Sequence, residues 1–363
     1  MPVRFYALPL IILLFFISGC ERKHHVILIN PADKKINYTG RINFDNIMRP
    51  EIYWPGSQIE IRFKGETLKV KLKDEKGKNY FNIIIDNDSL RYIKLDAREK
   101  LYTLAEGLPE GPHSIKLIKR TEWDWGKTWF YGFKIINGEL LEPPARNERI
   151  IEFFGNSITA GYAIEDLTGG DSPDSIFTNN YFTYGAIAAR HFDADYIGIV
   201  KGGIGVMVSW FPLIMPEMYD RLDPNDPTSK WDFSLITPDL VVVNLFQNDS
   251  WLVHMPDEPT FKQRLGDSPP DDEKIISSYG NFIRKLRNVY PDTPIICTLG
   301  SMDATREGSP WPGYVIKAVE SLADENIYTL FFPFINKEGH PRVDDNKKMA
   351  DQLIPFIEQN LEW

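Results

Sequence analysis

Four short stretches of the sequence carry residue types that together can transfer an acyl group. In chain order they are Gly155-Asn156-Ser157, Gly202-Gly203-Ile204-Gly205, Gln247-Asn248-Asp249 and Gly339-His340-Pro341. A serine hydroxyl becomes an effective nucleophile when a base takes its proton, and histidine titrates near neutral pH. The oxyanion that then forms needs hydrogen-bond donors, which backbone N–H groups and an asparagine amide can supply. We therefore expect a serine-hydrolase site that needs neither a cofactor nor a metal ion.

The second half of the chain predicts the elements that would bring these stretches together. Apolar runs alternate with helical runs, which is typical of a parallel sheet buried on both faces. The expected strands are 150–154, 196–200, 240–246, 295–299 and 327–332, and the expected helices are 181–191, 273–289, 314–324 and 344–360. This pattern predicts a three-layer α/β fold with a five-stranded parallel sheet. Because ligands gather at the carboxyl ends of such strands, the four stretches should converge at one edge.

The first half has a different rhythm. From about Val26 to Pro144, short runs such as Gln58-Ile59-Glu60-Ile61-Arg62-Phe63 alternate polar and apolar residues, and turn residues separate them. Many short alternating strands without a helical period favour an antiparallel β-sandwich. We therefore expect a β-sandwich (jelly-roll) domain at 26–144 and an α/β domain at 149–363, joined by a linker near 140–145.

The bulk composition argues against one class of partner. The 363 residues carry 51 acidic and 41 basic side chains, for a formal net charge of −10. Nucleic-acid binding needs clustered lysine and arginine, so we expect no nucleic-acid partner. The nine tryptophans are typical of carbohydrate-binding surfaces and also of β-sandwich cores.

The first residues indicate a targeting segment at 1–19. Arg4 precedes the apolar run Leu8–Ile17, which is too short for an ordinary membrane-spanning helix. The run leads into Ser18-Gly19-Cys20, which resembles the lipobox of bacterial lipoproteins, where the cysteine is lipidated and begins the mature chain. A plain secretory signal is the alternative. If Cys20 carries lipid, Cys297 has no partner, and its strand-like surroundings predict a small buried hydrophobic residue.

In their order and spacing, the four stretches resemble the four blocks of the SGNH (GDSL-type) hydrolase superfamily over residues 149–363. The first half, with Gly40-Arg41 and Trp54-Pro55-Gly56-Ser57, resembles the jelly-roll domain of carbohydrate esterase family 2. That family contains acetyl esterases that remove O-acetyl groups from xylan and glucomannan. The resemblance implies that Ser157 is the nucleophile and His340 the general base and acid. It implies oxyanion donors at Gly203, with Gly205 as a substitute, and at Asn248.

Three positions depart from the superfamily pattern. Asn156 replaces the usual aspartate and is expected only to support the turn. Phe246 replaces a glycine of the third block and is expected to narrow the pocket. Lys337 stands three residues before His340, where the superfamily has its acid. The resemblance to family 2 members with a Ser–His dyad favours a dyad whose imidazole is oriented by a backbone carbonyl, and Glu338 is the nearest carboxylate.

Structural interpretations compete with these assignments. A glycine–x–serine after a strand is common because serine caps helices, so the assignment of Ser157 depends on all four stretches occurring together. His254, six residues after Asn248, is the only rival base. Residues 122–126 could contact carbohydrate, but we favour packing against the catalytic domain.

Three tryptophans are expected near the same sheet edge, and ordinary packing is the more common role for any one of them. A sugar ring could stack on Trp251, Trp210 or Trp311, of which Trp251 is closest in sequence to Asn248. We name Trp251 and Trp210 as candidate substrate-binding residues.

Two functions fit this sequence. The first is a lipid-anchored acetyl esterase of the bacterial cell envelope, on the periplasmic or cell-surface face of the outer membrane. Its partners would be acetylated polysaccharides or oligosaccharides and the membrane, through Cys20; acetylated peptidoglycan is an alternative ester. The second is a carbohydrate-binding lipoprotein with an impaired site, which the substitutions at Asn156, Phe246 and Lys337 would favour.

Overall fold

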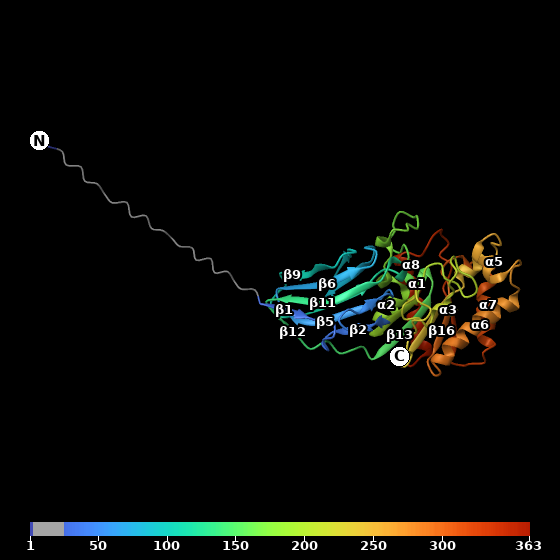
Figure 1. Ribbon diagram of the computed structural model, residues 1–363. Coiled ribbons are helices and arrows are strands. Elements are labelled where there is room, and N and C mark those ends of the chain that lie inside the picture. Colours follow the sequence, from blue (N-terminus) through green and yellow to red (C-terminus); the bar gives the residue numbers. More distant parts are fainter. Residues whose placement is uncertain (3–24) are drawn as a thin grey trace.

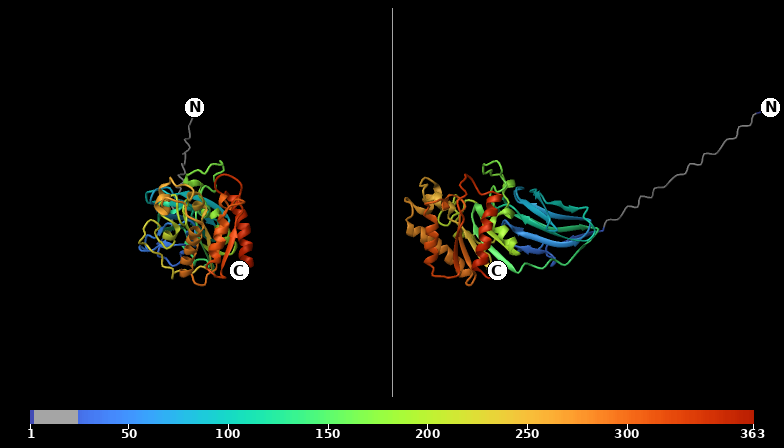
Figure 2. Two further views of the ribbon diagram at one scale, coloured as in Figure 1. Left: turned by 90° about the vertical axis from the view of Figure 1, so that its right-hand side faces the viewer. Right: turned by 180° about the vertical axis from the view of Figure 1, so that it is seen from behind.

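The structure, a computed structural model, describes residues 1–2 and 25–363. Residues 3–24, which include Cys20 and nearly all of the predicted signal segment, lie outside the described residues. An antiparallel β-sandwich occupies one end of the molecule and an α/β part the other (Figure 1). Figure 2 shows the same end-to-end arrangement from behind.

Two sheets form the β-sandwich, as predicted. The first sheet has the order β3-β4-β11-β6-β9 with β1 paired to β11, and the second has the order β12-β5-β10-β7-β8 with β2 paired to β5. The strands are β1 (Val26–Ile29), β2 (Asn37–Thr39), β3 (Ile42–Asn43), β4 (Glu51–Ile52), β5 (Gln58–Lys64), β6 (Thr67–Asp74), β7 (Tyr80–Ile85), β8 (Ser89–Lys94), β9 (Lys100–Glu106), β10 (Pro112–Lys119), β11 (Thr128–Ile136) and β12 (Glu139–Leu140). Alternation along β6 places Leu68, Val70 and Leu72 in the core between the sheets.

The α/β part contains the predicted five-stranded parallel sheet, in the order β14-β13-β15-β16-β17. Its strands are β13 (Arg149–Gly155), β14 (Ala194–Val200), β15 (Leu240–Asn244), β16 (Ile295–Leu299) and β17 (Ile327–Phe331). The helices are α1 (Ser157–Ala160), α2 (Tyr184–His191), α3 (Met215–Met218), α4 (Gln247–Leu252), α5 (Pro259–Leu265), α6 (Asp272–Val289), α7 (Trp311–Glu320) and α8 (Val343–Asn360). Single 3-10 turns lie at Trp123–Trp125, Ser175–Phe177, Asn180–Phe182 and Asp303–Thr305. Among the described residues, no helix combines the length and apolar character needed to cross a membrane.

Both faces of the parallel sheet are buried. Alternate residues of β15 point to opposite sides, so that Val241 and Val243 pack with residues of α6 and α7, whereas Leu240 and Val242 pack with residues of α2 and α8. The predicted three-layer arrangement is therefore confirmed. Cys297, in β16, is fully buried with a free thiol, as expected.

The sandwich is packed into the α/β part rather than tethered beside it. Trp54 and Trp123 of the sandwich belong to the same apolar cluster as β15 and α6. Arg41, also from the sandwich, is fully buried; its Nη2 lies 2.7 Å from Glu152 Oε1, and its Nη1 donates to the Tyr219 carbonyl at 2.6 Å. The two parts therefore form one continuous body.

Candidate active site

Ser157 is presented by a tight turn at the end of β13. Gly155 closes the strand, and a Cβ there would lie 2.2 Å from Thr159 Oγ1, so only glycine fits. Asn156 caps the following helix, since its Oδ1 accepts the Ile158 N–H at 3.0 Å. Asn156 therefore has the supporting position expected for it, and Ser157 begins α1.

His340 lies beside Ser157, although 183 residues separate them in the chain. Its Nε2 is 2.8 Å from Ser157 Oγ, and the ring of Tyr162 stands edge-on to the imidazole with centroids 5.0 Å apart. The rival base His254 is exposed and does not line the pocket that contains Ser157. The structure thus brings together the predicted nucleophile and base.

The expected Ser–His dyad is wrong, because a carboxylate contacts the other imidazole nitrogen. Asp171 Oδ2 lies 2.6 Å from His340 Nδ1. Neither alternative from the sequence takes this place: Glu338 is exposed, and Lys337 turns outward to pair with Asp345. The acid comes from the segment between α1 and α2, and the arrangement is a Ser–His–Asp triad.

Asp171 is held as a charged acceptor. It also accepts the His340 backbone N–H at 3.1 Å and Arg342 Nη1 at 2.9 Å. Burial raises the pKa of this carboxyl, but hydrogen bonds and charge from His340 and Arg342 outweigh burial and bring the pKa well below its usual range. An ionised Asp171 fixes the imidazole orientation and stabilises its protonated form.

Three groups near Ser157 can donate to an oxyanion. The Ser157 N–H belongs to the first residue of a helix and has no intrahelical partner. Gly203, at φ +81°, lines the pocket. Asn248 lines it as well; its Oδ1 accepts the Trp210 indole N–H at 3.2 Å, and Nδ2 donates to the Ile204 carbonyl at 2.8 Å, which uses one of the two amide hydrogens. Gly205 is the poorer glycine, because its N–H already donates to Ser209 Oγ.

Asp249 holds the loop that carries Gly203. Its buried carboxylate accepts the backbone N–H groups of Val206, Met207 and Val208, the shortest at 2.7 Å. Burial raises the pKa of Asp249 to about 6, while these N–H groups act in the opposite direction. The residue after Asn248 therefore shapes the oxyanion side of the site without facing the pocket.

Aromatic rings form much of the pocket wall around Ser157. The pocket has a volume of about 370 Å³, and its aromatic residues are Trp125, Tyr162, Trp210, Phe211 and Trp251. The Trp251 indole N–H donates to Asp303 at 2.8 Å, which fixes the ring.

One expectation about the aromatic residues near this pocket is wrong, and one open alternative is excluded. Phe246 does not narrow the pocket, because it points into the core and packs on Tyr279 and Trp311, with ring centroids 4.7 and 5.0 Å away. Trp311 is itself buried in that contact and is removed from the candidates for sugar stacking.

The sandwich supplies one side of the pocket. Glu122, Asp124 and Trp125, from the turn between β10 and β11, line it together with Ser157 and Lys201. Glu122 and Trp123 are buried against the α/β part, so the expected packing is confirmed for them. The same turn also presents Asp124 and Trp125 to the space in front of the nucleophile.

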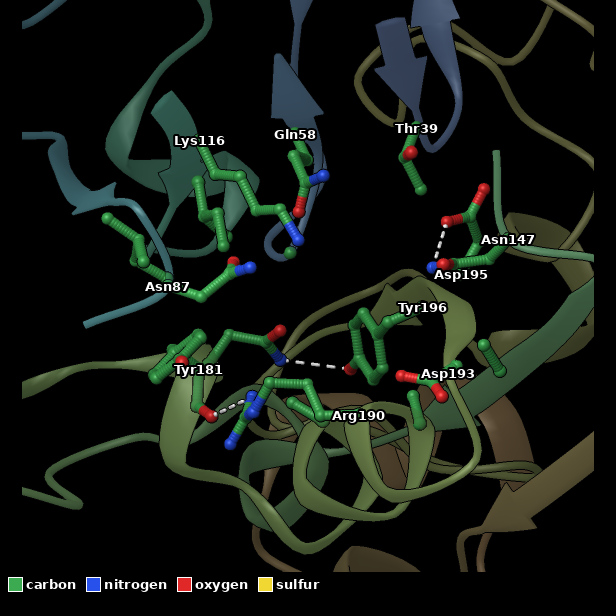
Figure 3. A pocket seen from close by; sticks show the side chains of 17 residues that line it. Thr39, Gln58, Asn87, Lys116, Asn147, Tyr181, Arg190, Asp193, Asp195 and Tyr196 are labelled. Atoms are coloured by element: carbon green, nitrogen blue, oxygen red, sulfur yellow. Dashed lines mark hydrogen bonds between the residues drawn. The ribbon is translucent and has the colours of Figure 1, made fainter. Parts of the chain in front are cut away.

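A second cavity, of about 310 Å³, lies between the sandwich and α2. Lys116 and Gln58 enter it from the sandwich, opposite Arg190 and Tyr196 (Figure 3). None of the three triad residues lines this cavity, so it is separate from the candidate active site.

Known proteins share this combination of β-sandwich and α/β part. The family model Carbohydrate esterase 2 N-terminal matches residues 38–144. A solved structure of a family two carbohydrate esterase from Clostridium thermocellum, in complex with cellohexaose, is 32% identical, covers 90% of this chain and 99% of that chain, and has a TM-score of 0.81. This chain belongs to carbohydrate esterase family 2.

Two curated relatives are similar to this family 2 protein but differ in how much of their length it covers. The cellulase/esterase CelE of Acetivibrio thermocellus is 33% identical over 343 residues, and the alignment covers 90% of this chain but 40% of the relative. An acetylxylan esterase / glucomannan deacetylase of Cellvibrio japonicus is 24% identical over 361 residues, with 96% of both chains covered. The family 2 protein therefore spans less than half the length of the first relative and nearly all of the second.

Proposed function

We propose that this protein is a serine esterase that removes O-acetyl groups from polysaccharides or oligosaccharides of the xylan or glucomannan type. The observation that carries the proposal is the contact of Ser157 Oγ with His340 Nε2 at 2.8 Å, backed by Asp171, in a pocket walled by tryptophans. Membership of carbohydrate esterase family 2 supports a carboxylic ester hydrolase. The names of the relatives support acetylated xylan and glucomannan as substrates.

In the first half-reaction, Ser157 Oγ attacks the acetyl carbonyl carbon and its proton passes to His340 Nε2. The carbonyl electron pair moves onto oxygen, where the Ser157 N–H, the Gly203 N–H and the second Asn248 amide hydrogen stabilise it. When the tetrahedral intermediate collapses, the sugar oxygen leaves with the proton from His340. Asp171 stabilises the imidazolium that exists between these two proton transfers.

In the second half-reaction, water takes the place of the sugar. His340 removes a proton from the water, the resulting hydroxide attacks the acetyl-serine, and the same three donors stabilise the second oxyanion. Collapse releases acetic acid and returns the proton to Ser157. These two half-reactions involve only the ester, water and the residues named above, and no electron acceptor takes part in them.

The alternative, a carbohydrate-binding protein with an impaired site, loses the features that favoured it. Lys337 lies outside the pocket, Phe246 is part of the core, and Asn156 supports the turn before Ser157. The esterase is therefore the better-supported function.

The test is release of acetate by the chain from Glu21 onward, compared with Ser157→Ala. Acetylated xylan, acetylated glucomannan and O-acetylated peptidoglycan serve as parallel substrates. We expect wild type to release acetate from xylan or glucomannan and Ser157→Ala to lose at least about 1,000-fold of this activity. Release from peptidoglycan alone would assign a different ester, and binding of glycan without any release would favour the impaired-site alternative.

We further propose that Cys20 is lipidated and anchors the protein in the bacterial cell envelope, at the periplasmic or cell-surface face of the outer membrane. The support is the sequence Ile17-Ser18-Gly19-Cys20 after a short apolar run. A labelled fatty acid should be incorporated into wild type and not into Cys20→Ser, which should leave the membrane fraction. Equal labelling of the two proteins would contradict the anchor.

A further inference from the structure

Asp171 lies on a long loop that the sandwich grips. This acid loop, residues 161–180, connects α1 to the turn before α2. Arg120 of the sandwich is 2% exposed and reaches the loop through three groups: its Nη2 donates to the Ile176 carbonyl at 2.7 Å and to the Glu165 carboxylate, and its Nε donates to the Thr178 carbonyl. One buried guanidinium thus joins the two arms of the loop on either side of Asp171.

Other sandwich residues hold the arm of the acid loop that follows Asp171. Asn82 Nδ2 donates to Asn179 Oδ1 at 2.9 Å, and the Ser175 hydroxyl donates to the Lys78 carbonyl at 2.8 Å. The Asn180 N–H donates to the carbonyl of Arg120 itself at 3.0 Å. These contacts fix residues 175–180 of the acid loop against the sandwich.

Glu122, two residues beyond Arg120 in the same sandwich segment, contacts the residues that precede Gly203. Glu122 Oε2 accepts the Gly202 N–H at 2.6 Å and lies 3.3 Å from Lys201 Nζ. Both partners immediately precede Gly203 in the loop of residues 201–209, here the oxyanion loop. Glu122 is buried, so its carboxylate and the Gly202 N–H have little competition from water.

We propose that Arg120 and Glu122 are positioning residues for catalysis, through which the sandwich places Asp171 and Gly203. This inference rests on the proposed function only in taking Ser157 as the activated nucleophile. A catalytic constellation has to be held within about 0.5 Å, and a displacement of about 1 Å can cost about 100-fold in rate. The sandwich is then part of the catalytic apparatus, and not only a wall of the pocket.

The test combines three measurements on the chain from Glu21 onward: kcat for acetate release, the rate at which a fluorophosphonate modifies Ser157, and the melting temperature. The fluorophosphonate reports activation of Ser157 without any glycan. Arg120→Met should lower both rates by about 10- to 100-fold, with KM nearly unchanged, and Arg120→Lys should recover part of the loss. If Arg120→Met does not fold, Glu165→Gln replaces it in the test, because this variant removes the carboxylate partner of Arg120 at a partly exposed position.

Arg41→Lys is the matched control. Arg41 is another buried arginine that reaches from the sandwich into the α/β part, but its hydrogen-bond partners, Glu152, Tyr219 and Arg221, lie outside the acid loop and the oxyanion loop. It should lower the melting temperature while both rates stay within about 2-fold, the level expected for independent sites.

A double-mutant cycle separates positioning from general damage. Because Arg120 acts through Asp171, Arg120→Met should change the labelling rate by less than about 2-fold in an Asp171→Asn background. Glu122→Ala should remain additive with Asp171→Asn, because it acts through the oxyanion loop. Glu122→Gln should retain most activity, since its side-chain oxygen still accepts the Gly202 N–H.

The outcomes distinguish this inference from the proposed function. Wild type that is labelled at Ser157 but releases no acetate would overturn the proposed function and leave the positioning role to be decided by the labelling rates. Labelling at the wild-type rate in Arg120→Met, Glu165→Gln and Glu122→Ala would overturn the positioning role. A wild type that is not labelled would overturn both.

Discussion

Asp171 precedes His340 by 169 residues, yet its Oδ2 lies 2.6 Å from His340 Nδ1. The acid of the site therefore comes from the segment that follows the nucleophile, and not from the residues just before the histidine. His340 and Arg342 both bind this carboxylate, so the start of α8 and the acid loop are joined at the site.

The first prediction concerns this acid. Asp171→Asn should lower kcat by about 100- to 10,000-fold, because a neutral amide neither fixes the required tautomer nor stabilises the imidazolium. Glu338→Gln, which changes an exposed carboxylate nearby, should leave kcat unchanged. Kinetics on acetylated xylan check both; a large loss in Glu338→Gln with full activity in Asp171→Asn would contradict the triad.

The second prediction is a pH dependence of stability. Burial raises the pKa of Asp171, but its hydrogen bonds to His340 and Arg342 lower the pKa by more than burial raises it, so the folded pKa lies below the unfolded value of about 3.9. Such a group contributes stability that is fully present above the unfolded pKa and is lost as pH falls through the folded pKa. The difference in unfolding free energy between wild type and Asp171→Asn should therefore shrink from about pH 5 downward. Urea titrations across this range measure it, and a difference that stays constant would count against the assignment.

The third prediction separates the two pocket tryptophans. Trp251→Ala should raise KM for acetylated polysaccharide by about 3- to 10-fold through loss of a stacking surface, and leave p-nitrophenyl acetate unaffected. Trp210→Phe keeps a ring but loses the N–H that binds Asn248 Oδ1, so it should lower kcat for both substrates. Equal effects of both variants on the small ester would contradict this division.

The fourth prediction concerns the oxyanion loop. Asp249→Ala leaves the N–H groups of Val206, Met207 and Val208 without their acceptor, which is costly for buried donors. Displacement of Gly203 should lower kcat by about 10- to 100-fold. Asp249→Asn keeps one acceptor oxygen, so its kcat should lie between those of wild type and Asp249→Ala. If Asp249→Ala turns over acetylated xylan at the wild-type rate, the loop does not depend on this carboxylate.

The fold and the pairing of Ser157 with His340 could be predicted from the sequence, because they follow local rules. Strands and helices repeat with periods of about 2 and 3.6 residues, and strand ends of a parallel sheet share an edge, which placed Ser157 near His340. Asp171 has no such signal, since its segment contains several aspartates and no periodic pattern that selects one. Only the folding of the acid loop against the sandwich decides which carboxylate meets the imidazole.

Phe246 shows why a matched position can mislead. It stands where the superfamily pattern has glycine, and its backbone keeps a left-handed φ of +84°, which glycine adopts without strain. That backbone turns the ring into the core against Tyr279 and Trp311, away from the pocket. A sequence comparison gives the position of a side chain in a block but not the direction in which it points.

The burial of Trp54 and Trp123 within the apolar cluster of the α/β part has a consequence for how this protein can be cut and recombined. The chain cannot be divided into two independent modules near residues 140–145, although this segment has the sequence of a linker. Expression of residues 149–363 alone would remove the indole rings of Trp54 and Trp123 from the interior of the α/β part. A chimera that exchanged the sandwich for that of a relative would replace part of the same interior. Engineering of this enzyme has to carry both parts together, and a change of substrate preference is better sought in single residues of the turn at 122–126.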